Sequence, residues 1–573
     1  MVKNGILKAD DIKYVFSKSQ FKMYKYYPNL LNEDGTVKVY GWDTYKDNFT
    51  KYNCHASKCN EEEDQFKGAK FNYQMLQTLV DMTDKELDKF IKPTKDLLTK
   101  AYTDKDTMLK ILGASKHNPN KNYLQQALEI YPELLHDKHV QKELSETISS
   151  KKKDAKFAKV SLDAKYTFLL PDIFAWMGFS ICGNKNPEGL LANGEVSCKL
   201  YKGKKELLVD RSPHLFLEHC VRNNVTDSVK SKWFTTNGIY TSCHDLISKT
   251  LQFDNDGDKS LVVGDLDIIK IAKRNMEGIL PLYYEMGKAD PREISNSVIW
   301  DSLKLAFKYG NIGKYSNKLT ALWNAEERDL DTCKVICSLN NFSIDAAKTL
   351  VMPKLTGEIG KKVSAVNQLK LPYFFQFAKD KEVDTVAPMN NSTVNRLCAK
   401  VEEIGIHDYD FSGVGNFRSA MLMNNPKIVI VDEVVNKYDE LNKVKDTWFM
   451  KATLPKEEVA PAIYARIKKE LLEVCPELSI VDVVDMIIKH IYKNHRGQKK
   501  TFLFNCFGDI IVENLKNKTK KRLDDGYFQC SCCGKRIKRS NAKQTMCKPC
   551  AKKADKEKAR LRVKASRSLK PAI

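Results

Sequence analysis

Three aspartates stand within five residues in the segment Asp254-Asn255-Asp256-Gly257-Asp258, which has apolar residues on both sides. Carboxylates packed this closely repel one another unless a cation lies between them, and hard oxygen ligands suit Mg²⁺ or Ca²⁺. Gly257 allows a sharp backbone turn, so that three side chains can converge on one ion. The pattern predicts a metal loop with Asp254, Asp256 and Asp258 as ligands. A solvated acidic turn is the alternative, which the apolar flanks make less attractive.

A calcium EF-hand loop also begins with acidic residues at positions one, three and five. Its sixth position is glycine and its twelfth is a bidentate glutamate. Here these positions hold Lys259 and Asp265, and Ser260–Val263 has the composition of a strand instead of a helix. We therefore expect Mg²⁺ in this loop and not Ca²⁺.

A second metal site is expected near the C-terminus, where Cys530-x2-Cys533 is followed after thirteen residues by Cys547-x2-Cys550. Two such pairs can supply four thiolates in tetrahedral geometry, which is typical of a zinc ribbon. Cys532 is an additional thiol that could replace a neighbour. A zinc ion bound by four thiolates has no open position, so the predicted zinc is structural and not catalytic. A redox role is less favoured, because two pairs at this spacing are rarely accidental.

Positive charge is concentrated around these cysteines. Residues 515–573 hold 20 Lys/Arg and 4 Asp/Glu, which gives this segment a formal charge of +16 out of the chain's +22. A concentrated basic region favours binding to a polyanion through its phosphates. Two alternatives remain: a solvated tail, and a ribbon that docks on another protein.

The chain is long enough, at 573 residues, for three to five domains. With 42% apolar and 29% charged residues it has the composition of a globular protein, and no apolar run is long enough to cross a bilayer. Most of the 16 cysteines are scattered singly, as expected for reduced thiols in a protein core. We expect a cytoplasmic protein, or a nuclear one, that does not act in a membrane.

Local patterning divides the chain into six segments and predicts an α+β fold. Val37–Trp42 has a strand-like composition, Thr83 with Glu86 forms a helix capping box, and Val196–Tyr201, Leu207–Val209 and Ser260–Val263 are expected strands. The segments are a mixed region with short strands (1–70), a helical connector (71–157), a β-rich region that contains the acidic loop (158–290), two largely helical regions (291–385 and 386–525), and the zinc ribbon with its basic tail (526–573).

The acidic loop, placed between two strands, resembles the metal loop of the double-ψ β-barrel RNA polymerases. This family includes multisubunit cellular polymerases, the RNA-dependent RNA polymerases of eukaryotic RNA silencing, and single-chain phage enzymes. About forty residues upstream, Asp210-Arg211-Ser212-Pro213-His214-Leu215 resembles the family's Arg-x-Pro segment, whose arginine approaches the nucleotide sugar. The family usually has histidine three residues after this proline. Phe216 occupies that place here, with His214 and His219 on either side, so the histidine's role is not carried over.

Further segments resemble the family in the same order along the chain, over about residues 12–380. These are Ser19-Gln20-Phe21-Lys22 at the end of a first barrel, Phe71–Leu79 as an Asn-x-Gln helix between barrels, Gly189-Leu190-Leu191 and Gly194-Glu195-Val196 as strands that open the catalytic barrel, and Asn311-Ile312-Gly313, Ser316-Asn317 and Ser343–Lys348 as helices after it. Collinearity of several weak matches is more specific than any one of them.

The resemblance implies a template-directed RNA polymerase with a double-ψ β-barrel, helical domains and a zinc ribbon. Asp254, Asp256 and Asp258 would bind one Mg²⁺, and a second would arrive with the nucleoside triphosphate. Arg211 would position the ribose or the transferred phosphate, and Lys22 would bind the triphosphate. Only about twenty residues precede Lys22, too few for the rest of the first barrel. Either a second polypeptide completes this barrel, as a partner beside an RNA or DNA template, or the first barrel is reduced and the protein lacks activity.

Two other functions are compatible with the sequence. One is a catalytically inactive nucleic-acid-binding protein that retains the barrel and the ribbon. The other is a different metal-dependent nuclease or primase, in which carboxylates come from distant segments and activity does not depend on Lys22 or Arg211. The sequence leaves the template, DNA or RNA, and the need for a primer open. The resemblance to phage enzymes favours the cytoplasm of a bacterial or phage-infected cell.

Overall fold

The computed structural model describes most of the chain. The described residues are 21, 27–55, 61–63, 66, 68–116, 118–280, 282, 287, 290, 293, 295–405, 408–411, 413–452, 455–494, 497, 499–524, 527–530, 536–538 and 544–556, with the backbone alone at 347–348, 520–524, 527–529 and 536. The chain divides into two compact units. Unit 1 comprises Met1–Asp96 with Lys152–Ile404, and unit 2 comprises Leu97–Lys151 with Gly405–Ile573. The predicted connector 71–157 thus contributes to both units.

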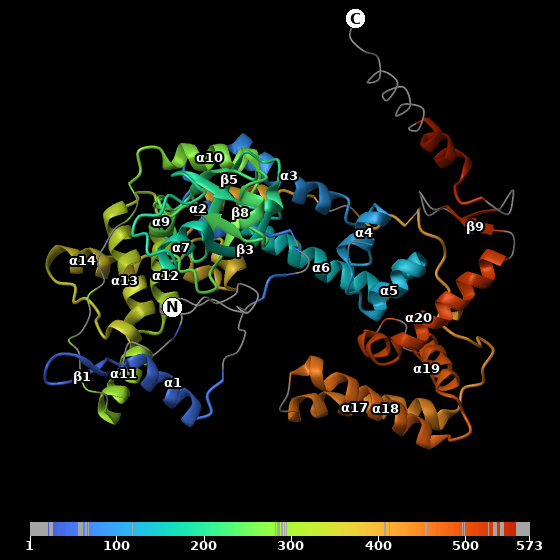
Figure 1. Cartoon of the computed structure of the whole chain (residues 1–573). Helices are drawn as coiled ribbons and strands as arrows, with labels where there is room; N and C mark the ends of the chain where they lie inside the picture. Colours follow the sequence, from blue (N-terminus) through green and yellow to red (C-terminus); the bar gives the residue numbers. More distant parts are fainter. Residues whose placement is uncertain are drawn as a thin grey trace, which may run out of the picture. The chain divides into compact units, whose positions relative to one another are not determined.

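The centre of unit 1 is a closed barrel of six strands in the order β3-β7-β4-β6-β5-β8 (Figure 1). The pairs β3/β7 and β4/β6 are parallel, and the other neighbours are antiparallel. Closure leaves no strand edge open to pairing with another chain. The strands are β3 (Ala164–Pro171), β4 (Glu195–Ser197), β5 (Glu206–Arg211), β6 (Cys220–Asn224), β7 (Ile239–Thr241) and β8 (Lys259–Val263). The predicted β-rich region therefore forms a single barrel.

The interior of the barrel is apolar, because alternate residues of each strand point inward. Leu207 and Val209 of β5 pack there with Val196 of β4 and Val262 of β8, and all four are fully buried. The residues between them, Leu208 and Asp210, are directed to the outer face of the barrel. This alternation decides which side chains of β5 reach the acidic loop.

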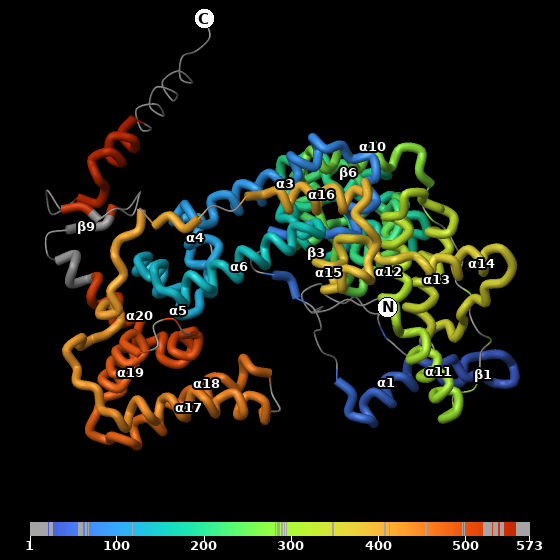
Figure 2. The backbone as a smooth tube through the Cα atoms, turned by 180° about the vertical axis from the view of Figure 1, so that it is seen from behind, coloured from blue at the N-terminus to red at the C-terminus, as the bar shows by residue number. Residues whose placement is uncertain are grey.

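Helices surround the barrel within unit 1. They include α2 (Tyr73–Gln77), α3 (Asp84–Thr99), α7 (Ile173–Ser180), α8 (Lys230–Trp233), α9 (Ile247–Leu251), α10 (Leu266–Met276), α11 (Asn296–Tyr309), α12 (Ile312–Trp323), α13 (Leu330–Thr349), α14 (Gly357–Ala365), α15 (Phe375–Ala378) and α16 (Thr393–Glu402), with short 3-10 helices η5 (Lys199–Tyr201), η6 (Val366–Gln368) and η7 (Val383–Thr385). Figure 2 shows α3 and α16 side by side, and the ion pair Lys400–Asp88 joins them at 3.0 Å.

The capping box predicted at the start of α3 is confirmed. The Glu86 N–H donates to Thr83 Oγ1 at 3.3 Å, and the Thr83 N–H donates to Glu86 Oε2 at 2.8 Å. These bonds satisfy two amide groups that have no partner inside the helix. Two strand limits were wrong. Strand β2 (Val37–Val39) ends before Trp42, which lies in α1 (Gly41–Lys51), and β4 ends at Ser197 because η5 follows.

Unit 2 is mainly helical. Its elements are α4 (Lys105–Ile111), α5 (Tyr123–Ile130), η4 (Pro132–His136), α6 (Lys138–Lys156), which extends into unit 1, η8 (Ser419–Met421), α17 (Asp432–Lys451), α18 (Lys456–Val474), α19 (Ile480–Asn494), α20 (Thr501–Asp524) and the hairpin β9 (Tyr527–Gln529) with β10 (Arg536–Lys538). A buried ion pair of 3.1 Å between Lys500 and Asp137 ties its segments together. In neither unit do the described residues include a helix with the length and apolarity that a bilayer requires.

Candidate active site and metal centres

The acidic loop joins α9 to β8 at one end of the barrel. Gln252 ends α9 in the left-handed conformation, with φ of +52°, and Gly257 has φ of +123°. Positive φ at Gly257 is the backbone freedom that the sequence predicted for this turn. The Leu169 N–H of β3 donates to the Asp258 carbonyl at 2.9 Å, which fixes the end of the loop to the barrel. The loop is therefore held by the strands while its side chains reach solvent.

Arg211 contacts the acidic loop because of strand register. Arg211 is the last residue of β5, and it pairs with Ser260 of β8. Ser260 lies two residues after Asp258. Its Nη2 lies 2.9 Å from Asp258 Oδ2, and its Nη1 donates to the Gln252 carbonyl. The guanidinium thus offers positive charge to one loop carboxylate and a hydrogen bond to the residue that starts the loop. The two candidate residues that the sequence placed forty residues apart lie together.

A helix outside the barrel also supports the loop. Asn341 Nδ2, from α13, donates to Gln252 Oε1 at 2.5 Å. Gln252 therefore has its carbonyl bonded to Arg211 and its side chain bonded to α13. The sequence analysis did not single out Gln252 or Asn341, because neither amide has a pattern that distinguishes it from a surface residue.

The three loop aspartates differ in exposure. Asp254 and Asp256 are exposed, whereas Asp258 is partly buried against Arg211. The Asp254 N–H donates to Asp258 Oδ2 at 3.1 Å, so the loop is closed by a bond between its first and last aspartates. Among the described residues, the two sets of three ligand groups within 4.8 Å of one another do not include this loop. The loop carboxylates would have to draw together to share one ion.

Lys259, the residue after the loop, faces away from the three aspartates. Its Nζ lies 3.3 Å from Glu63 Oε1 and 4.6 Å from the centre of the Phe168 ring. The ammonium group therefore has its own acidic and aromatic partners.

Phe216 occupies the place where the resembling family has histidine, and it belongs to the core. It is 2% exposed, and its ring centre lies 5.8 Å from that of Trp323 in α12. The Trp323 Nε1–H donates to the Leu215 carbonyl at 2.9 Å. This segment thus attaches the barrel to α12 and α13, and no polar group replaces the family's histidine at this position.

His214 and His219 lie together in a buried cluster that the sequence analysis missed. Both contact Thr78 Oγ1, at 3.1 Å and 2.9 Å from their Nε2 atoms. His219 Nδ1 lies 3.0 Å from Asp210 Oδ1. Nearby, burial raises the pKa of Glu218 to about 8. The spacing of an aspartate and two histidines over ten residues was the available signal, but their common partner, Thr78, is distant in sequence.

Two other segments of the resemblance also meet. Asn72 caps α2 by accepting a hydrogen bond from the Met75 N–H at 3.1 Å. Gln74, two residues later, donates from Nε2 to Ser316 Oγ of α12 at 3.0 Å. The Asn-x-Gln segment and the Ser316-Asn317 segment are therefore neighbours in unit 1.

Three of the four predicted zinc ligands are described, and they come together in unit 2. The sulfur atoms of Cys530, Cys547 and Cys550 lie within 4.8 Å of one another. Cys530 and Cys547 are 2% exposed, and the Cys547 N–H donates to Cys530 Sγ at 3.2 Å. Sulfur ligands that converge in a buried site and accept backbone hydrogen bonds fit a tetrahedral zinc ion. Cys533 lies outside the described residues, as do Lys22 and most of the basic tail.

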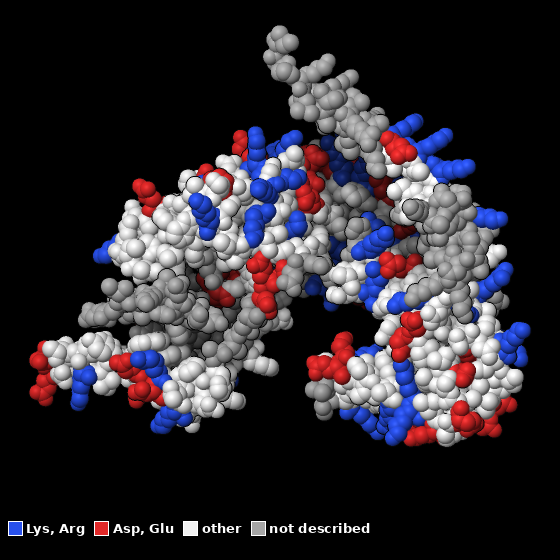
Figure 3. Space-filling view, turned by 45° about the vertical axis from the view of Figure 1, so that its right-hand side comes forward, with Lys and Arg blue, Asp and Glu red and all other residues white. Residues whose placement is uncertain are grey.

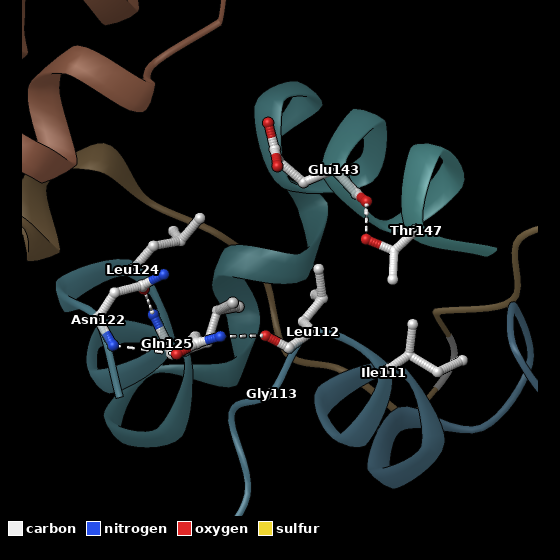
Figure 4. Close-up of a pocket in the computed structure, with 9 residues that line it drawn as sticks. Ile111, Leu112, Gly113, Asn122, Leu124, Gln125, Glu143 and Thr147 are labelled. Atoms are coloured by element: carbon white, nitrogen blue, oxygen red, sulfur yellow. Dashed lines mark hydrogen bonds between the residues drawn. The ribbon is translucent and has the colours of Figure 1, made fainter. Parts of the chain in front are cut away.

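Unit 2 also contains a pocket (Figure 4), and none of these residues lines it. Its lining residues are Ile111, Leu112, Gly113, Asn122, Leu124, Gln125, Leu128, Glu143 and Thr147. Its polar groups serve the local fold: the Gln125 side chain donates to the Leu112 carbonyl at 3.0 Å, and Thr147 Oγ1 donates to the Glu143 carbonyl at 2.7 Å. This pocket has the features of helix packing and not those of an active site.

Figure 3 shows lysine and arginine side chains interspersed with acidic ones on the visible face of the molecule. Surfaces with both signs of charge are common on globular proteins. The charge that the sequence concentrates after residue 515 lies largely in segments outside the described residues.

Comparison with known proteins gives one close relationship. Over 552 residues, 96% of the chain, the sequence is 43% identical to the DNA-directed RNA polymerase YonO of Bacillus phage SPbeta. The chain spans 62% of the length of that relative. The RNA-dependent RNA polymerase QDE-1 from Thielavia terrestris is similar in structure with a TM-score of 0.46 and 12% identity, covering 79% of this chain and 57% of that one. No protein-family model matches the chain.

Proposed function

We propose that this chain is a member of the RNA polymerase family and carries the metal-binding part of a template-directed RNA polymerase active site. The observation that carries the proposal is the position of the acidic loop: three aspartates between α9 and β8, contacted by Arg211 from the adjacent strand. The sequence relationship to a phage RNA polymerase supports it over nearly the whole chain. The barrel is the double-ψ barrel of that family.

Asp254, Asp256 and Asp258 are the Mg²⁺ ligands. Three carboxylates offer hard oxygen donors, and two of them are exposed to solvent, from which a hydrated ion can arrive. When bound, two Mg²⁺ ions supply activation of the attacking hydroxyl and stabilisation of the leaving oxygens. Lys259 does not supply a second positive charge to the loop, because its ammonium group pairs with Glu63. A metal ion bound here would add positive charge to that which Arg211 brings to the loop.

Arg211 positions the substrate. Its contacts with Asp258 and the Gln252 carbonyl hold the guanidinium beside the metal loop, and a planar guanidinium can bind either a ribose hydroxyl or a phosphate. Lys22 binds the triphosphate in this proposal. A second polypeptide that supplies the remainder of the first barrel is part of the same proposal.

The cysteine cluster holds a structural Zn²⁺ through Cys530, Cys533, Cys547 and Cys550. The convergence of the three described sulfur atoms supports this assignment. The surrounding lysines and arginines contact the phosphates of the template or product. Binding through phosphates weakens steeply as salt concentration rises, which distinguishes it from docking on a protein.

The experiment that tests the proposal compares Asp256→Asn with Asn255→Ala, a change at the neighbouring exposed loop residue. Nucleotide incorporation is measured with the full chain, alone and with candidate first-barrel polypeptides, on DNA and RNA templates with Mg²⁺. DNA is the first template to test, because the related phage enzyme is described as DNA-directed. We expect Asp256→Asn to lose incorporation and to retain nucleic-acid binding, while Asn255→Ala retains both.

A different result supports the second candidate, an inactive nucleic-acid-binding protein. In that case wild-type protein binds nucleic acid and incorporates no nucleotide with any template or partner. Equal activity of wild type and Asp256→Asn contradicts the assignment of the loop and favours carboxylates elsewhere in the chain.

A further inference from the structure

Asp210, His214 and His219 form a cluster on the outer face of the barrel. Asp210 is 0% exposed, as is His214, and His219 is 2% exposed. The two imidazole ring centres lie 4.3 Å apart, with 33° between their planes. Thr78, the residue that ends α2, closes the other side of the cluster. The cluster therefore joins the helix between the barrels to strand β5.

The hydroxyl proton of Thr78 determines the protonation of both rings. Thr78 Oγ1 donates to the Met75 carbonyl at 2.9 Å, and a carbonyl can only accept. The single proton of the hydroxyl is used in this bond. The Nε2 atoms of His214 and His219, 3.1 Å and 2.9 Å away, must therefore carry protons and donate to the Thr78 oxygen.

In a neutral imidazole only one nitrogen carries a proton. With Nε2 protonated, the Nδ1 atom of each ring presents a lone pair. His219 Nδ1 lies 3.0 Å and 3.2 Å from the two oxygens of Asp210, which are also acceptors when the carboxyl is ionised. Acceptors at this distance repel each other unless a proton or a metal ion lies between them.

The surroundings of His214 Nδ1 favour a metal ion over a shared proton. This buried atom has no hydrogen-bond partner among the described residues, and it lies 4.0 Å from Asp210 Oδ1, too far for a hydrogen bond. A proton shared by Asp210 and His219 leaves this lone pair unsatisfied, whereas an ion bound by all three residues does not.

We propose that Asp210, His214 and His219 bind one divalent metal ion, with Zn²⁺ the best match. The Nδ1 atoms of His219 and His214 lie 3.0 Å and 4.0 Å from Asp210 Oδ1, and one ligand atom from each residue lies within 4.8 Å of the other two, which suits an ion bonded to each at about 2.0–2.2 Å. Two imidazoles and a carboxylate form a common ligand set for zinc, and a buried water can take the fourth position. The cation neutralises the buried carboxylate.

Thr78 acts as a positioning residue for this metal ion. Metal-binding histidines usually donate their second N–H to a nearby acceptor, and here one hydroxyl accepts from both rings. The site has no solvent-exposed ligand, so its role is structural: it fastens α2 to β5. It is distinct from the acidic loop, because Asp210 and Arg211 point to opposite faces of the strand. The inference does not depend on polymerase activity.

Elemental analysis of the purified full chain tests the proposal. The cysteine cluster is expected to hold one zinc ion and this cluster a second, so wild-type protein should contain two. Cys547→Ser with Cys550→Ser should leave one, and addition of His214→Ala should leave none. His244→Ala, at an exposed histidine of unit 1, should retain both ions. A folded cysteine variant without metal overturns the proposal, as does a metal content that His214→Ala does not change.

Cobalt substitution identifies the ligands independently. In the cysteine variant, Co²⁺ should give visible absorption without the near-ultraviolet charge-transfer band of thiolate ligands. If His214→Ala does not fold, Thr78→Val provides the second test, because it keeps all three ligands and removes only the acceptor. We expect Thr78→Val to weaken metal affinity by about 10–100-fold. Unchanged affinity, or a failure of Co²⁺ to bind the cysteine variant, contradicts the assignment.

Discussion

Arg211 Nη2 lies 2.9 Å from Asp258 Oδ2, which places the basic residue of β5 beside the last aspartate of the acidic loop. The antiparallel pairing of β5 with β8 produces this contact, since Arg211 is opposite Ser260. The positive charge of Arg211 reduces repulsion among the loop carboxylates, and its guanidinium contacts one of them, Asp258. It thus lies beside the carboxylates proposed to bind Mg²⁺.

Arg211→Lys should reduce nucleotide incorporation at least tenfold, equivalent to about 1.4 kcal/mol. Lysine retains the charge but cannot contact both Asp258 and the Gln252 carbonyl with a planar group. Steady-state kinetics check this, with Arg274→Lys on α10 as the control, since Arg274 pairs with Asp81 and Glu86. A loss of the same size in Arg274→Lys would show that any change of this type impairs the enzyme.

Asn341→Ala should lower the maximal rate of incorporation by about 3–10-fold, because it removes the bond that α13 makes to Gln252. Template affinity should not change, since Asn341 lies behind the loop. Ser338→Ala is the control on the same helix, where the hydroxyl donates to the Lys334 carbonyl. A fall in template affinity with an unchanged maximal rate would contradict the supporting role of Asn341.

Asp245→Ala should destabilise the protein by about 3–5 kcal/mol. Asp245 is 8% exposed and accepts from Arg222 Nη2 at 2.8 Å and from the Gly194 N–H at 3.1 Å. The change leaves a partly buried guanidinium without its carboxylate. Urea unfolding measures the loss, and Lys334→Ala, which removes an exposed pair with Asp331, should cost less than about 1 kcal/mol. Equal costs would rule out a special role for burial.

The contribution of Glu86 to the stability of the fold should decrease in acid. Hydrogen bonds from Arg274 lower the pKa of Glu86 from 4.5 to about 2. The contribution is complete above about pH 4.5, where the unfolded chain is also ionised, and is lost as pH falls towards 2. Thermal unfolding should show that wild type loses more stability than Glu86→Gln between these values. Glutamine keeps the capping box, so parallel pH profiles would contradict the ionic origin.

Zinc removal should affect unit 2 locally. A strong chelator should release the zinc proposed for the cysteine cluster and unfold β9, β10 and the segment around Cys547, with little change in the barrel away from α2 and β5, where the second proposed ion lies. Amide hydrogen exchange before and after chelation measures this, and Cys547→Ser should reproduce the effect. Loss of protection throughout unit 2 would indicate that the ribbon stabilises the whole unit.

The sequence alone determined the features that depend on neighbouring residues. Three short patterns are of this kind: the five residues of the acidic loop, the spacing of the cysteines, and the capping box of Thr83 and Glu86. Each can be recognised from the order of residues in a short stretch of sequence. The expectation of helical segments follows from local periodicity in the same way. The predicted strand ends at Trp42 and Tyr201 were wrong, because a composition typical of strands does not determine where pairing with another strand stops.

Tertiary structure alone decided which distant side chains meet. Strand register brings Arg211 to Asp258, and packing of α2 on the barrel brings Thr78 to His214 and His219. Alternation along β5 sends Asp210 and Arg211 to opposite faces, so that two adjacent residues serve two separate clusters. Such contacts arise from closure of the barrel and from burial of whole helix faces, which no local pattern encodes.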